Sequence, residues 1–94
     1  MASYRIEVSA TAEKQIRKLS RDDQIRVLRA IKPLAREPHP AGARKVRGHD
    51  DVFRIRVGTY RVLYRVVGRR LIIIILKVGH RREIYRSMRR GAVR

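Results

Sequence analysis

The chain has 94 residues, no cysteine and a formal net charge of +17 at pH 7, with 25 Lys and Arg against eight Asp and Glu. This length predicts a single domain over residues 1–94, and the lack of cysteine excludes thiolate catalysis and zinc–thiolate centres. The charge excess favours a polyanion or an acidic protein as partner.

The positive charge is concentrated in the second half of the chain. Residues 1–37 carry nine basic and five acidic residues, whereas residues 38–94 carry sixteen and three. Twenty of the basic residues are arginine, whose planar guanidinium suits bidentate phosphate contacts. Nucleic acid is therefore the first partner to consider. The longest apolar run, residues 71–76, is too short to cross a bilayer, and no secretory signal is visible, so a cytoplasmic protein without membrane contact is expected.

The N-terminal part predicts a strand followed by a helix. Apolar and charged residues alternate over residues 4–8, which is typical of a half-buried strand. Ser9 can then cap a helix over residues 10–19. The apolar stripe of this helix is expected to comprise Ala12, Ile16 and Leu19.

A second helix begins after Ser20. Ser20 and Asp23 have the spacing of a capping box, with Asp in place of Glu. Pro33 removes a backbone donor, so the regular helix is expected to kink or end near Lys32. Its buried stripe is expected to comprise Val27, Leu28, Ile31 and Leu34.

The remaining chain predicts a loop and an antiparallel meander. Residues 39–51 are rich in Pro, Gly and charge and indicate a loop with a short strand at residues 44–46. Three strands are expected at residues 53–57, 60–67 and 70–78, joined by turns at Gly58–Thr59 and Gly68–Arg69.

The apolar run at residues 71–76 indicates where its strand lies in the sheet. Successive apolar residues predict a strand covered on both faces, and hence an interior position. The N-terminal strand is then expected on one side of it and residues 60–67 on the other. The predicted architecture is an α+β fold in two layers, a helical hairpin on a sheet whose last strand is central.

Alternation within residues 60–67 gives this sheet two chemically different faces. Arg61 and Arg65 project from the face opposite to the apolar positions of the strand. The sequence therefore predicts one core face and one anion-facing face. The core positions are Tyr60, Val62, Tyr64 and Val66.

This order of elements resembles the RelE/ParE superfamily of toxins from type II toxin–antitoxin modules. The resemblance covers nearly the whole chain. Its most specific parts are KVRGHDDVFRIRVGTYRVLYRV at residues 45–66 and VGHRREIYR at residues 78–86.

Resemblance to the RelE branch implies a ribonuclease that cleaves mRNA in the ribosomal A site without a metal or other cofactor. The 2′-hydroxyl attacks the adjacent phosphate and leaves a 2′,3′-cyclic phosphate and a 5′-hydroxyl. The family positions match Arg54, Arg56, Arg61, Arg81 and Tyr85. In the best-studied branch the first two are lysines, so this chain departs from the pattern there.

That departure bears on the general base. Arginine does not accept a proton near neutral pH, so Arg54 and Arg56 are poor bases, although they can clamp a phosphate. Arg61 and Arg81 are expected to stabilise the transition-state charge. The base is then Tyr85 or His80.

Further cations are expected to bind RNA phosphates around this site. The full expected set is Lys45, Arg47, Arg54, Arg56 and Arg82. Arg65 is interpreted as part of the solvated side of the sheet, and His39 and His49 as loop residues without chemistry.

Two other functions remain open from sequence alone. ParE-like members share the fold but act on DNA gyrase, and a non-catalytic RNA-binding module has a similar charge. The resemblance also implies a cognate antitoxin with an acidic segment that lies across the basic surface. A nuclease would have the ribosome and mRNA as further partners.

Overall fold

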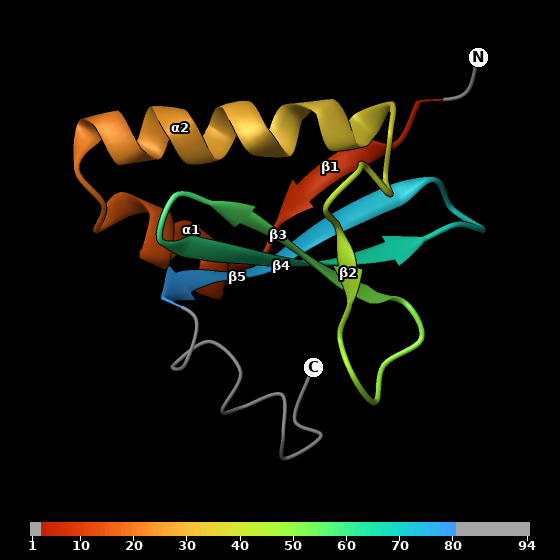
Figure 1. Ribbon diagram of the computed structural model, residues 1–94. Helices are drawn as coiled ribbons and strands as arrows, with labels where there is room; N and C mark the ends of the chain where they lie inside the picture. The colour runs from red at the N-terminus through yellow and green to blue at the C-terminus, as the bar shows by residue number, and fades with distance from the viewer. Residues whose placement is uncertain (1–2, 81–94) are drawn as a thin grey trace.

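A computed structural model describes residues 3–80 of the chain (Figure 1). Two helices lie on one side of a five-stranded sheet, which is the predicted α+β fold. The elements are β1 (Arg5–Val8), α1 (Ala10–Arg17), α2 (Arg21–Ile31), the 3-10 helix η1 (Lys32–Ala35), β2 (Arg44–Lys45), β3 (Val52–Val57), β4 (Tyr60–Val67) and β5 (Ile72–His80).

The sheet confirms the predicted arrangement of the last strand. Its order is β1-β5-β4-β3-β2, with β1 parallel to β5 and the other neighbours antiparallel. β5 is therefore an interior strand, flanked by β1 and β4. The edge strands have only four residues (β1) and two residues (β2), which limits the unpaired backbone offered to other chains.

Both helices begin at serine caps, as predicted. Ser9 Oγ accepts a hydrogen bond from the Ala12 amide at 3.0 Å, and Ser20 Oγ accepts one from the Asp23 amide at 3.2 Å. α2 ends at Ile31, and the chain continues past Pro33 as η1. Within the described residues, no helix has the length and apolar character needed to span a membrane.

The prediction for the buried stripe of α2 is wrong at one position. Val27 and Ile31 are buried, but the Leu28 side chain is 48% exposed. Residues four apart share a helix face, whereas the next residue is rotated by about 100°. α2 therefore meets the sheet along a narrower stripe than the sequence predicts.

Apolar residues are buried on both faces of the sheet. The larger group, the helix-side core, comprises Ala12, Ile16, Val27, Ile31, Leu34, Ile55, Val57, Val62, Tyr64, Ile73, Ile75 and Val78. The smaller group, the second core, comprises Val46, Val52, Leu63 and Leu76, with Ile74 packed against it. The first five residues of β5 are all apolar and thus point alternately to the two faces of the sheet.

A β-bulge interrupts the pairing of β4 with β5. Tyr64 pairs with Ile75 and Leu63 with Lys77, so Leu76 is an extra residue in β5. From Lys77 onward, the alternation of β5 is shifted by one residue. This shift brings Val78 opposite Val62 in the helix-side core and Lys77 opposite Leu63 on the other face.

α1 covers the edge of β5 beyond the end of β1. Ser9 Oγ donates to the Leu76 carbonyl at 2.9 Å, and the Val78 amide donates to Gln15 Oε1 at 2.7 Å. Side chains of α1 and of its cap therefore make the hydrogen bonds that a neighbouring strand would make. Buried backbone groups need such partners.

The turn between β4 and β5 differs from the prediction. Leu71 was expected inside the strand, but β5 begins at Ile72. Leu71 has φ 55° and is 39% exposed, so it belongs to the turn, and its carbonyl accepts a hydrogen bond from the Arg5 amide at 2.8 Å. A left-handed leucine cannot be anticipated from an unbroken apolar run.

Tyr64 is fully buried, as its alternation predicts, and its hydroxyl donates to the Pro38 carbonyl at 2.7 Å. Burial raises the pKa of Tyr64 to about 12, from an ordinary value of 10.0. The neutral phenol is therefore favoured by the fold. The resulting stabilisation is complete below pH 10 and is lost as pH rises towards 12.

We expect the free energy of unfolding of the wild type to fall by about 1–2 kcal/mol between pH 9 and pH 11 relative to Tyr64→Phe. The variant lacks the ionisable hydroxyl but keeps the ring. Urea titrations of both proteins across this range measure the difference. Parallel pH profiles for the two proteins would contradict the assignment.

Candidate functional site

Several arginines from three adjacent strands share the sheet face opposite to the helices. Arg56 on β3 lies directly opposite Arg61 on β4, and Arg54 lies opposite Leu63. On the other side of β3, Arg44 of β2 pairs with Arg54. Alternation places all four on the face of the second core, and we call Arg44, Arg54, Arg56 and Arg61 the arginine face.

The arginine face combines exposed and buried guanidinium groups. Arg44 and Arg56 are exposed and Arg54 is half-buried. Arg61 lies on the face predicted for it, but it is only 7% exposed. Its Nη1 donates to the Tyr60 carbonyl at 3.3 Å, and it makes at least one further interaction. A partly desolvated cation interacts more strongly with an anion than one in bulk water does.

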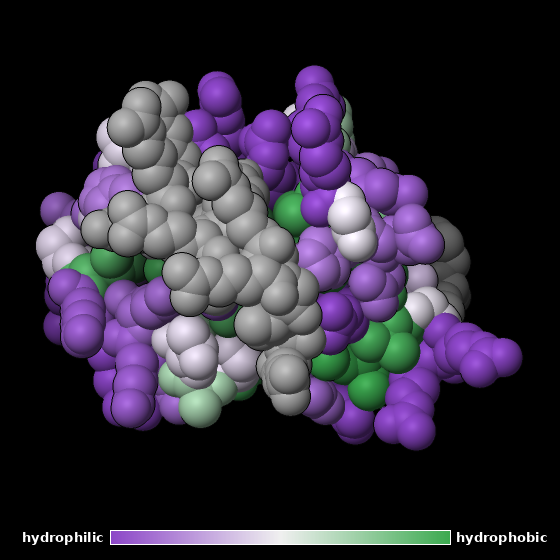
Figure 2. Space-filling model, turned by 90° about the horizontal axis from the view of Figure 1, so that it is seen from below, coloured by the Kyte–Doolittle hydropathy of each residue, from purple (hydrophilic) through white to green (hydrophobic). Residues whose placement is uncertain are grey.

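Two carboxylates of the described residues on this side of the sheet are paired with arginines. Asp51 Oδ2 lies 3.2 Å from Arg65 Nε, an ion pair whose geometry is not that of a hydrogen bond. Glu7 Oε2 lies 3.1 Å from Arg5 Nη2. Pairing with Asp51 agrees with the structural interpretation of Arg65. Seen from the side away from α2, the described surface is mostly hydrophilic around smaller hydrophobic patches (Figure 2).

Two of the expected phosphate-binding residues are not placed with the arginine face. Lys45 pairs with Phe53, so alternation puts it on the helix side of the sheet. Arg47 is exposed in the turn that follows β2. Arg81, Arg82 and Tyr85 lie outside the described residues.

His80 lies on the helix side of the sheet, away from the arginine face. It is the last residue of β5 and pairs with Tyr60. The two rings are stacked, with centroids 4.9 Å apart and an interplanar angle of 29°. Arg61 is the next residue after Tyr60 and therefore projects from the opposite face. The structure thus brings Arg54, Arg56 and Arg61 together and separates His80 from them.

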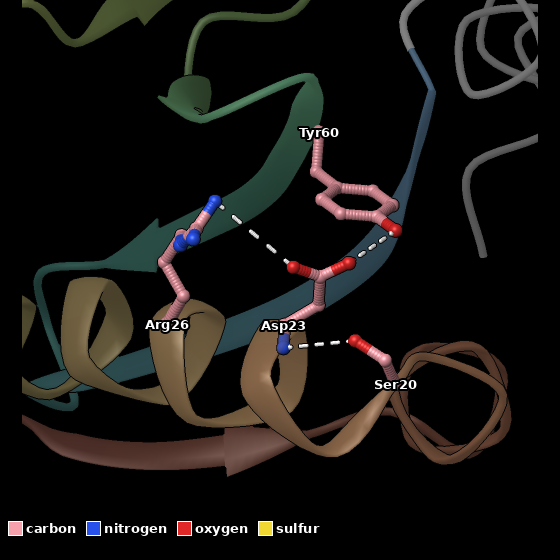
Figure 3. A network of polar contacts seen from close by, with 4 residues as sticks. All are labelled: Ser20, Asp23, Arg26 and Tyr60. Carbon is pink, nitrogen blue, oxygen red and sulfur yellow. Dashed lines mark hydrogen bonds and ion pairs between the residues drawn. The ribbon is translucent and has the colours of Figure 1, made fainter.

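Tyr60 connects this end of the sheet to α2 (Figure 3). Its hydroxyl donates to Asp23 Oδ2 at 2.9 Å, while Arg26 Nη1 lies 4.0 Å from Asp23 Oδ1. The hydrogen bond to the carboxylate raises the pKa of Tyr60, and burial adds to the effect. No sequence signal predicts this link, because Asp23 is already explained as part of a helix cap.

Comparison with known families agrees with this fold. A model of the family described as ParE toxin of type II toxin-antitoxin system, parDE, matches residues 6–85. The chain belongs to the RelE/ParE superfamily of toxins. The match spans both helices and all the described strands, including the arginine face of this toxin.

Individual relatives carry RelE-type names. The toxin is 36% identical to toxin RelG of Mycobacterium tuberculosis over 84 residues, which cover 88% of this chain and 97% of RelG. It is similar to a chain of the RelBE2 toxin–antitoxin complex from the same organism, with a TM-score of 0.72, 31% identity and coverage of 85% and 100% of the two chains. An archaeal RelE–RelB complex from Pyrococcus horikoshii gives a TM-score of 0.75 at 30% identity, covering 85% and 97%.

Proposed function

We propose that the toxin is a ribosome-dependent endoribonuclease that cleaves mRNA. The observation that supports this most directly is the arginine face. Arg56 and Arg61 lie opposite each other across β3 and β4, with Arg54 two residues away from Arg56 on the same face. Such a group can hold one phosphodiester from several sides, and the nearby carboxylates are neutralised by other arginines.

The chemistry that suits this face is attack of a 2′-hydroxyl on the adjacent phosphate. A bond forms between O2′ and phosphorus, the bond to the 5′-oxygen breaks, and the products are a 2′,3′-cyclic phosphate and a 5′-hydroxyl. Negative charge grows on the phosphoryl oxygens during this step. Arg61, which is largely shielded from water, is the described residue best suited to stabilise it.

The proton from the 2′-hydroxyl needs an acceptor. Guanidinium groups do not accept protons near neutral pH, so the arginine face does not supply one. Tyr85 remains the predicted base, and Arg81 the predicted second stabiliser of charge. Because positioning dominates such a reaction, the ribosome is expected to order the mRNA for in-line attack.

We also propose a cognate antitoxin as the partner that holds the toxin inactive. The RelBE2 and archaeal RelE–RelB structures contain toxins together with antitoxins. For a chain of net charge +17, an acidic antitoxin segment is the complementary ligand. It would lie across the arginine face and compete there with RNA.

Inhibition of DNA gyrase is the second candidate function. The matching family model is named for ParE, whereas the similar proteins include toxin RelG and chains of the RelBE2 and archaeal RelE–RelB complexes. Fold is shared between these branches, so only the target distinguishes them.

The deciding experiment measures both targets in parallel. After induction of the toxin, primer extension on several mRNAs is expected to show new 5′ ends inside translated codons, and only while ribosomes translate them. Purified toxin is expected to leave gyrase supercoiling unchanged and to cut free RNA slowly. Gyrase inhibition without mRNA cuts would overturn the nuclease proposal and establish the ParE-like one.

A further inference from the structure

The stacked pair of Tyr60 and His80 lies at the end of the sheet from which the arginine face projects on the other side. Tyr60 directly precedes Arg61 in β4, and His80 follows Gly79, the residue paired with Arg61. The two rings therefore belong to the cross-strand pair next to the pair of Arg61 and Gly79. A contact that holds Tyr60 and His80 in place also holds the backbone that carries Arg61.

Tyr60 is held through both its side chain and its backbone. Its hydroxyl is bonded to Asp23, whose own amide is bonded to the Ser20 cap, so the ring is tied to the first turn of α2 (Figure 3). Its carbonyl accepts the bond from Arg61. Tyr60 is thus a fixed platform, whereas the His80 side chain is exposed and rests on it.

The same geometry argues against proton transfer by His80. A general base must come within about 2.6–3.2 Å of the hydroxyl that it deprotonates, directly or through one water. A phosphate bound by Arg56 and Arg61 lies on one side of the sheet, and the imidazole lies on the other side, against Tyr60. The imidazole nitrogens are therefore far from the reacting groups, whereas the ring contacts Tyr60, which directly precedes Arg61 in β4.

We propose that His80 is a positioning residue, which acts through the stack of its ring on Tyr60 and not as a base. The stack holds the end of β5 against the start of β4, next to the pair formed by Arg61 and Gly79. This inference rests on the proposed endoribonuclease function and assigns His80 and Tyr60 their parts in it.

The test compares two substitutions of His80 that differ in ring stacking. His80→Phe keeps an aromatic ring on Tyr60 and removes the imidazole, whereas His80→Ala removes the ring. In ribosome-dependent cleavage, His80→Phe is expected to keep kcat within about threefold and an unchanged pH profile. His80→Ala is expected to lose about 10- to 100-fold in kcat, the scale of a displacement of about 1 Å in a reacting group. Equal losses in the two variants, or full activity of His80→Ala, would overturn the proposal.

A double-mutant cycle tests whether the two rings act together. Tyr60→Leu removes the platform, and the double variant Tyr60→Leu/His80→Ala is expected to be no slower than the worse single variant, because both changes remove the same stack. Multiplicative losses would contradict a shared role. Unfolding curves of all variants identify losses that come from unfolding alone. If the wild type makes no cuts, the proposed function fails, whereas cuts by the wild type with equal defects in the two His80 variants refute only the positioning role.

Discussion

Arg61→Ala is expected to abolish growth inhibition and to lower mRNA cleavage by about 10²–10³-fold, the effect of removing one group that stabilises transition-state charge. Arg61 lies opposite Arg56 and is only 7% exposed. When its side chain is removed, bulk water therefore does not take over its role of stabilising the phosphate charge. Arg61→Lys keeps the charge and is expected to restore only part of the activity, because lysine lacks the bidentate fork. Cleavage by purified variants on programmed ribosomes measures both effects.

The matched control for Arg61 is Arg65→Ala. Arg65 is on the same strand and face but is paired with Asp51 at 3.2 Å. Its removal is expected to change cleavage only a few-fold, because its guanidinium group is paired with Asp51. The loss of a partly exposed ion pair lowers the stability of the fold by only about 0–1 kcal/mol. Both variants are expected to co-purify with the antitoxin, which shows that they are folded. Full toxicity of Arg61→Ala at equal expression would refute the nuclease site.

Ile73→Ala is expected to have the largest effect on stability, a loss of about 2–5 kcal/mol in the free energy of unfolding. Ile73 is 0% exposed, belongs to the helix-side core and lies on the interior strand β5. For a domain whose total stability is about 5–15 kcal/mol, such a loss removes a large share of the free energy of unfolding. Chemical denaturation of the purified protein measures the change.

The adjacent Ile74 provides the control for this prediction. The two residues have the same chemistry and are neighbours in one strand, but Ile74 is half-buried against the second core. Ile74→Ala is expected to cost less than about 2 kcal/mol, since less apolar surface returns to water. Equal losses at both positions would show that the two faces of β5 contribute equally to stability.

The sequence predicted those parts of the fold that follow from the pattern of apolar and polar residues within a single segment. Alternation assigned Tyr64 to the core and Arg61 and Arg65 to the opposite face, and the serine caps located both helix starts. The length of the apolar run placed β5 inside the sheet. Each of these inferences depends on local sequence alone, which explains why they are confirmed.

The features that the sequence did not predict depend on relations between segments. The burial of Leu28 depends on how α2 is rotated against the sheet, and that of Arg61 on what surrounds β4. The face on which His80 lies depends on the bulge at Leu76, which is a property of two paired strands. An apolar run has no alternation of its own that could reveal such a shift. The contact between Asp23 and Tyr60 joins residues 37 positions apart and has no sequence signature.

The bulge at Leu76 also affects how relatives of this toxin are to be aligned. If β5 kept this sequence but paired with β4 without the bulge, Lys77 would point into the helix-side core and His80 would move to the face of the arginines. A relative with one residue fewer in β5 is therefore aligned correctly beyond this point only if the gap is placed at Leu76. A gap placed a few positions later would match residues from opposite sides of the sheet and transfer roles between side chains that never meet the same ligand.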